Sequence, residues 1–134
     1  MTGEYAAGNT AFLPLFWLFV KHFICDFPLQ AFPWMYRNKG TYLHLGGIAH
    51  AGIHGAGTLI VLAPFIGTLT VVLAIVLAII DMLVHYHIDW AKMNISKRYD
   101  LQPNNSERFW ILLGFDQLLH HLTYFVIIYY AFIL

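Results

Sequence analysis

Charged side chains are scarce in this chain, and their scarcity argues against a water-soluble fold. Asp, Glu, Lys and Arg make up 10% of the 134 residues, whereas a soluble domain carries about 25%. Hydrophobic residues make up 60%, and the mean hydropathy is +0.65. Several apolar runs approach the roughly 20 residues that a transmembrane helix needs. The sequence therefore predicts an all-α integral membrane protein whose residues 1–134 form one domain.

Cysteine is nearly absent and the net charge is zero, and each of these features excludes a class of site. The single Cys25 cannot form an internal disulfide, and so little thiolate argues against a cysteine-based zinc site or an iron–sulfur cluster. A net charge of zero provides no field that would attract nucleic acid. The segment Met1–Asn9 has no basic residue, so we expect no cleaved signal peptide.

Four apolar runs predict four membrane spans, at about 10–27, 44–65, 68–90 and 109–134. With four spans, the two loops that contain basic residues lie on the same side of the membrane. The positive-inside rule places both loops in the cytoplasm and both termini on the non-cytoplasmic side. The expected fold is a four-helix bundle. Lys21, inside the first span, is expected to extend to the cytoplasmic headgroups. The loop cations are Arg37, Lys39, Lys92, Lys97, Arg98 and Arg108.

Each predicted span carries a pair of ionisable residues at positions i and i+4, which places both side chains on one helical face. Neighbouring spans run in opposite directions, so all the pairs fall in the cytoplasmic half of the bilayer. Ionisable residues inside spans are costly and mostly functional. Helix bundles commonly build metal sites from inward carboxylates and imidazoles, so these residues are the expected metal ligands. The pairs are His22 and Asp26, His50 and His54, Asp81 and His85, and Asp116 and His120.

The charges of these residues indicate the cofactor. Three or four carboxylates in a low-dielectric interior would be protonated unless cations compensated them. Two divalent ions with neutral imidazoles would neutralise them almost completely. Mixed oxygen and nitrogen ligands suit Zn, Mn or Fe(II), so we expect a divalent transition metal, with two ions bound. The alternative is a purely structural network, in which each interhelical hydrogen bond would contribute only about 0.6 kcal/mol.

Two further ionisable residues, one at the end of the third span and one just after it, are the predicted catalytic residues. Asp89 lies one turn beyond His85 and closest to the cytoplasmic surface, where water and substrate would enter. It is therefore the candidate general base, with a role as a metal ligand as the other interpretation. Lys92 or Arg37 could hold an anionic headgroup. The imidazoles of His44, His87 and His121 lie off the shared face or at a span edge, and we expect interfacial or supporting roles for them.

Four motifs contain these residues: HxxxDFxLQ at 22–30, HxxxH at 50–54, DxxxHxxxDxxK at 81–92 and DQxxH at 116–120. Through them the chain resembles a family of small polytopic membrane proteins from bacteria and phages. The resemblance covers nearly the whole chain and implies an integral protein of the bacterial inner membrane, without implying an activity. A looser likeness, in the helical His and Asp pairs alone, is to membrane-bound metal-dependent hydrolases, and it is an analogy of site type.

The leading hypothesis is a metal-dependent hydrolase that acts on an amphiphilic phosphoester or acyl substrate from the cytoplasmic leaflet. Its partners would be the lipid bilayer and that substrate, with no nucleic acid; a homo-oligomer is left open. A divalent-cation or proton-coupled transporter is an alternative, because ion pathways use His and Asp inside spans. A haem or quinone-binding electron carrier is another, because histidines on facing spans can ligate haem. A non-catalytic membrane adaptor is the remaining interpretation.

Overall fold

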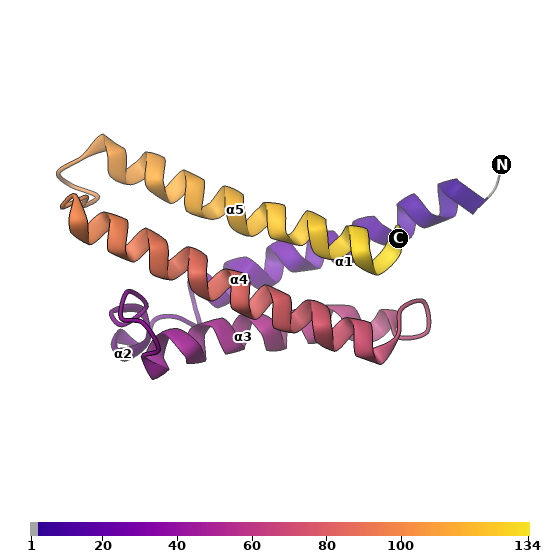
Figure 1. Cartoon of the computed structure of the whole chain (residues 1–134). Coiled ribbons are helices and arrows are strands. Elements are labelled where there is room, and N and C mark those ends of the chain that lie inside the picture. Colours follow the sequence, from indigo (N-terminus) through magenta and orange to yellow (C-terminus); the bar gives the residue numbers. More distant parts are fainter. Residues whose placement is uncertain (1–2) are drawn as a thin grey trace.

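The computed structural model describes the backbone of residues 3–134 and the side chains of residues 11–134. Every regular element in this part of the chain is helical, which confirms the all-α prediction (Figure 1). The elements are α1 (Gly3–Asp26), α2 (Pro33–Tyr36), α3 (Leu45–Leu62), the 3-10 turn η1 (Ala63–Phe65), α4 (Val71–Arg98) and α5 (Glu107–Phe132).

Three of these elements are long and apolar enough to cross a membrane. They are α3 together with η1 over 21 residues, α4 over 28 residues and α5 over 26 residues. Each meets the length of about 20 residues that a span requires. They coincide with the predicted spans 44–65, 68–90 and 109–134. The predicted span 10–27 corresponds to most of α1, a helix of 24 residues.

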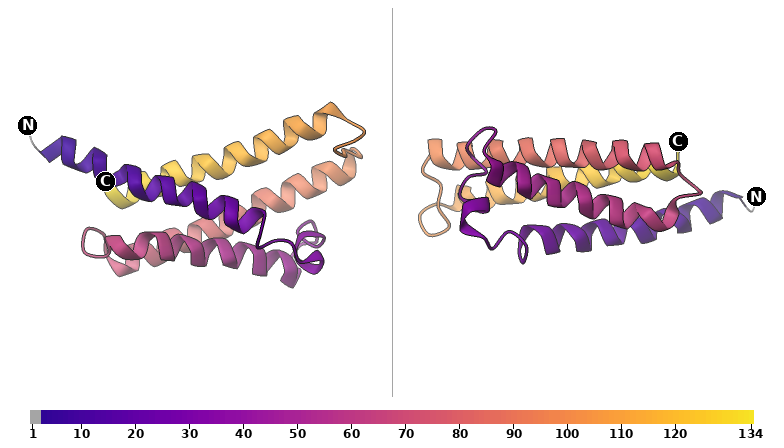
Figure 2. Two further views of the ribbon diagram at one scale, coloured as in Figure 1. Left: turned by 180° about the vertical axis from the view of Figure 1, so that it is seen from behind. Right: turned by 90° about the horizontal axis from the view of Figure 1, so that it is seen from below.

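The long helices pack in a closed order. Helix α1 packs against α3 and α5, and α4 packs against the same two helices. Neighbouring helices run in opposite directions, as Figures 1 and 2 show. The segments 27–44 and 99–106 therefore lie at one end of the molecule, which we call the loop end. The turn that contains η1 lies at the other end with the C-terminus, and we call this the turn end. The antiparallel order brings the ionisable pairs of all the long helices to the loop-end half.

Helix α4 is longer than the sequence indicates. The third span was predicted to end near Trp90, yet α4 continues for two more turns to Arg98. Apolar periodicity ends at Trp90, but residues 91–98 contain neither proline nor glycine to stop the helix. Lys97 and Arg98 in the last turn also interact favourably with the helix dipole. Helix α5 begins at Glu107, close to the predicted start at 109, and its N-cap is Ser106, whose hydroxyl accepts a hydrogen bond from the Arg108 N–H at 3.2 Å.

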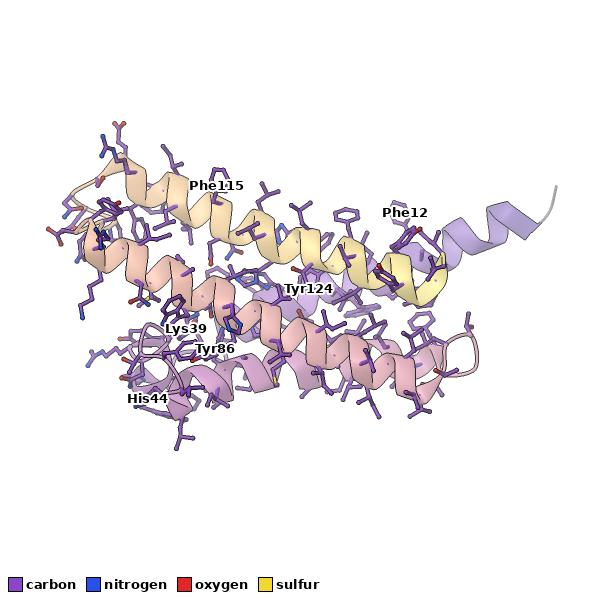
Figure 3. All side chains as sticks on the ribbon, viewed as in Figure 1. Phe12, Lys39, His44, Tyr86, Phe115 and Tyr124 are labelled. Carbon is purple, nitrogen blue, oxygen red and sulfur yellow. The ribbon has the colours of Figure 1, made fainter. Side chains whose placement is uncertain are left out.

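Burial is inverted relative to a water-soluble protein. Large apolar side chains such as Phe16, Trp17, Ile60 and Phe115 are exposed, and Phe115 points outward from α5 in Figure 3. Most of the ionisable side chains of the long helices are buried instead. Soluble proteins show the opposite distribution, and an apolar outer surface of this extent is typical of a protein that faces lipid.

The two halves of the interior differ in chemistry. The turn-end half has an apolar core in which Leu18, Leu62 and Ile127 are fully buried. Tyr124 lies at the boundary, inside the bundle and close to α4 (Figure 3). The loop-end half holds the buried ionisable residues, so any chemistry of this protein is concentrated there. Those residues are Lys21, His22, Asp26, Lys39, His50, His54, Asp81, His85, Asp89, Asp116 and His120.

Candidate metal centre

Four buried side chains from three helices converge on one point, and we call them the four-ligand group. They are Asp26 from α1, His50 and His54 from α3, and His85 from α4. Asp26 Oδ1 lies 3.1 Å from Nε2 of both His50 and His54, and 3.6 Å from Nε2 of His85. The Nε2 atoms of His50 and His85 are 3.0 Å apart. Three imidazole nitrogens and one carboxylate oxygen thus face one another.

These separations fit tetrahedral coordination. Ligands placed 2.0–2.1 Å from a zinc ion at the corners of a tetrahedron lie about 3.3 Å apart. The four separations given above range from 3.0 to 3.6 Å, and all the ligand atoms lie within 4.8 Å of one another. The four-ligand group could therefore hold a metal ion with little rearrangement. One predicted pair, His50 with His54, is complete in this group, and it is joined by one member of each of two other pairs, Asp26 and His85.

A second set of buried side chains, the three-ligand group, consists of Asp89, Asp116 and His120. His120 Nε2 lies 3.7 Å from Asp89 Oδ1 and 3.5 Å from Asp116 Oδ1. Both Asp116 Oδ1 and His120 Nε2 are buried without a hydrogen-bond partner among the described residues. Leaving such atoms unpaired is costly, and a cation between them would satisfy both.

Asp89 connects the two groups. Its Oδ1 faces His120, while its Oδ2 lies 3.2 Å from His50 Nε2 and 3.3 Å from His85 Nε2. The side chain is only 3% exposed. The sequence placed Asp89 beside the metal site at the entry for water, whereas the structure places it between the two ligand groups. Of its two predicted roles, these contacts favour that of a metal ligand.

Asp81, a predicted ligand, lies outside the ligand groups found among the described side chains. Its Oδ2 is 2.7 Å from the Lys21 ammonium and accepts a hydrogen bond from the Thr58 hydroxyl at 2.5 Å. The prediction that Lys21 extends to the headgroups is wrong, because this ion pair holds it inside the bundle. Gly57 leaves room for the Lys21 side chain to reach Asp81, because a Cβ at position 57 would lie only 2.6 Å from Lys21 Cγ.

Two more lysines approach the ligand groups. The buried Lys39 ammonium lies 2.6 Å from Asp89 Oδ2 and 3.3 Å from His50 Nε2. Lys92 Nζ lies 3.8 Å from Asp116 Oδ2. Together with Lys21, these lysines supply much of the positive charge that the sequence analysis assigned to metal ions. Lysines thus share the role of counter-ion that the sequence analysis gave to metal ions alone.

His22 is held mainly by hydrogen bonds within the protein. Its Nε2 lies 3.0 Å from Gln117 Oε1 and 3.2 Å from Asp26 Oδ2, and its Nδ1 lies 2.9 Å from the Tyr124 hydroxyl. The Lys21 ammonium donates to the same hydroxyl at 3.2 Å. His22 also belongs to a further set of converging imidazoles with His85 and His120. It thus orients Asp26 and connects it to the Lys21–Asp81 pair.

The imidazole rings are oriented by packing against one another. The rings of His54 and His85 stack at 3.5 Å between centroids, and those of His85 and His120 stack at 4.1 Å. Nδ1 of His50, His54 and His85 has no partner among the described residues. Metal-bound histidines usually donate this second N–H to a carboxylate or carbonyl, so this site differs from the common pattern.

Several contributing residues were not predicted. Thr58 follows His54 by four residues, and Tyr124 follows His120 by four residues, so both continue a series that the sequence already displays. The spacing of residues does not point to Lys39, because it lies in the segment between α2 and α3, outside any helix. His44 and His87 lie outside the ligand groups, as expected: His44 Nδ1 accepts a hydrogen bond from the Gly46 N–H at 3.0 Å and caps α3.

Comparison with known proteins adds a family but not an activity. Residues 14–134 match the family described as "Protein of unknown function (DUF3307)". This chain belongs to the DUF3307 family. The match includes every residue of both ligand groups, and it confirms the predicted resemblance to a family without an assigned activity. The looser likeness to metal-dependent hydrolases gains no support from it. No curated protein and no solved structure matches the chain.

Proposed function

We propose that this protein is a membrane-embedded, metal-dependent hydrolase that acts on an amphiphilic substrate from the cytoplasmic leaflet. The observation that supports it best is the pairing of two ligand groups through Asp89. Structural metal sites are usually closed by four protein ligands, whereas catalytic sites keep a position open for water or substrate. The four-ligand group has the number of ligands of a structural site, and the three-ligand group has that of a catalytic site.

In this proposal the two ligand groups have different roles. An ion in the four-ligand group would tie α1, α3 and α4 together, and zinc fits its three nitrogens and one oxygen best. An ion in the three-ligand group would polarise the substrate and lower the pKa of a water molecule. Asp89 Oδ1 faces this group, so Asp89 would serve there either as the proton acceptor or as a ligand of the ion. Lys92, beside Asp116, would hold an anionic group of the substrate.

The proposal includes four membrane spans with both polar loops in the cytoplasm. The position of the basic residues at the loop end supports this orientation. In a Cys25→Ala background, single cysteines at Thr68 and Asn104 should react with an impermeant reagent from opposite faces of the membrane. Labelling of both from one face would contradict the topology.

Geometry disfavours the two alternative functions. A haem needs a slot between its axial ligands, and the stacked rings of His54, His85 and His120 leave none. A transporter needs a path across the membrane, and the buried side chains described in the turn-end half are almost entirely apolar. A hydrolase needs access from one side only.

Metal content and turnover of an Asp89→Asn variant test the proposal. Purified protein should contain a transition metal and cleave a fluorogenic lipid phosphoester or a fluorogenic lipid acyl ester. The variant should lose turnover by about 10²–10⁴-fold if Asp89 is the proton acceptor. A parallel fall in metal content would assign it as a ligand. Asp100→Asn, at an exposed loop carboxylate, is the matched control. Protein that is metal-free after purification without chelators would refute the proposal.

A further inference from the structure

Two cavities meet at Lys92, and they differ in chemistry. The first is a groove of about 580 Å³ between α4 and α5, with His87, Lys92 and Asp116 as its ionisable lining residues. The second, of about 370 Å³, lies at the loop end and is lined in part by Gln30, Tyr36, Lys39 and Lys92. The first volume lies within the roughly 300–1,000 Å³ that is typical of ligand sites.

The groove is open to lipid along its length. Its walls include Leu83, Val84, Ile95, Phe115 and Leu119, which are exposed on the outer surface of α4 and α5. These are the helices that lie side by side in Figure 1. An acyl chain could enter sideways from the bilayer and lie along these apolar walls between the helices.

The end of the groove carries positive charge. The Lys92 side chain is 19% exposed, and its ammonium is 3.8 Å from Asp116 Oδ2, too far for a hydrogen bond. None of the hydrogen bonds among the described residues involves this ammonium, so its donors are available to an anion. Lys39 lines the same polar cavity. A phosphate near Lys92 would lie beside Asp116 of the three-ligand group.

We propose that the groove and the polar cavity together bind one anionic phospholipid, with an acyl chain between α4 and α5 and its phosphate at Lys92. This inference rests on the proposed function in that the bound lipid would be the substrate of the hydrolase. It assigns the substrate class by the charge at one end of an apolar groove, and it makes Lys92 the residue that recognises the headgroup.

Photocrosslinking in nanodiscs of phosphatidylcholine tests the assignment. The probe is an ether-linked phosphonate analogue of phosphatidic acid with a diazirine in its acyl chain, which has no ester to cleave. Peptide mapping should place most adducts on residues 83–95 and 112–119. Ala91→Trp, which fills the groove, should reduce them at least fivefold. Lys92→Gln should abolish most of the preference of unlabelled phosphatidic acid over phosphatidylcholine as a competitor.

The matched control is Ala56→Trp, which fills a comparable apolar groove between α1 and α3 and should leave the adducts unchanged. If Ala91→Trp does not fold, Leu112→Trp fills the same groove from α5. Adducts spread evenly over all lipid-facing helices, or lost equally in Ala56→Trp, would refute the assignment. Because binding is read without turnover, a lipid site in a protein without metal would contradict the proposed hydrolase and leave this site in place.

Discussion

The two halves of the bundle are built from the same helices but are stabilised in different ways. Along α4, Ala74 and Leu77 lie in the apolar turn-end half, Asp81 lies at the border, and His85 and Asp89 follow in the loop-end half. In lipid, burying an aliphatic side chain between helices removes no water, so the apolar half depends on close packing. In the polar half, each buried charge must keep its partner. The comparison indicates that packing fixes the shape of the protein and that ion pairing fixes the register of its helices.

The largest effect is expected in the polar half, from Asp26→Ala. The change removes the carboxylate that lies 3.1 Å from both His50 and His54. Loss of a supporting partner of a metal ligand typically lowers affinity about 10–100-fold, and loss of the ligand itself should exceed this. Elemental analysis of purified protein should show loss of the ion from the four-ligand group.

His87→Ala is the control for this experiment, because His87 is exposed and lies outside the ligand groups. It should retain the metal content of the wild-type protein. Equal metal content in wild-type and Asp26→Ala protein would mean that the ion is held elsewhere. The two halves would then differ in their buried charges but not in metal binding by the four-ligand group.

The next effect concerns the ion pair at the border of the halves. Lys21→Met leaves Asp81 buried without its partner, which should destabilise the protein by about 3–5 kcal/mol. The free energy of unfolding of the wild-type protein and the variant, obtained by denaturation in micelles, measures this loss. The metal content should be retained, because Asp81 lies outside the ligand groups.

The double change Lys21→Met with Asp81→Asn should recover much of that stability, since neither charge is then left alone. A double variant no more stable than Lys21→Met would show that the pair is not the stabilising contact. A loss of metal in either variant would return Asp81 to the ligand set that the sequence predicted.

The smallest effect is expected in the apolar half. Leu62→Ala removes a fully buried side chain beside η1. The expected loss is about 2 kcal/mol, at the low end for buried leucines, because the adjoining turn can relax into the space. Thermal unfolding in the same micelles measures it, and metal content should not change. Metal loss in this variant would mean that the two halves are coupled more tightly than their contacts indicate.

The sequence predicted the helices well because hydrophobicity and i, i+4 spacing are local properties. It placed three spans close to α3, α4 and α5, and it found every residue of both ligand groups. It did not predict how residues from different helices combine. Whether Asp81 meets a metal or Lys21 depends on how α1 and α4 pack with α3, which local spacing does not encode.

The lysines show this limit most clearly. Lys21 would be expected at the headgroups by its length and charge, but a glycine on α3 lets it cross to Asp81. Lys39 lies outside any periodic segment, and its contact with Asp89 arises only when the segment after α2 folds against α4. Both lysines changed the charge balance from which the number of metal ions was inferred.

The long separation in sequence between ionic partners has a consequence for synthesis. Lys21 and Asp81 are 60 residues apart, and His22 and Tyr124 are 102 residues apart. At a translation rate of about 5–20 residues per second, Lys21 leaves the ribosome about 3–12 s before its partner. Asp26 can meet His50 and His54 once α3 is made, but until α4 follows, Lys21 has no counter-ion. In the proposed four-span topology, α1 would therefore have to be held by the translocon or an insertase until α4 arrives.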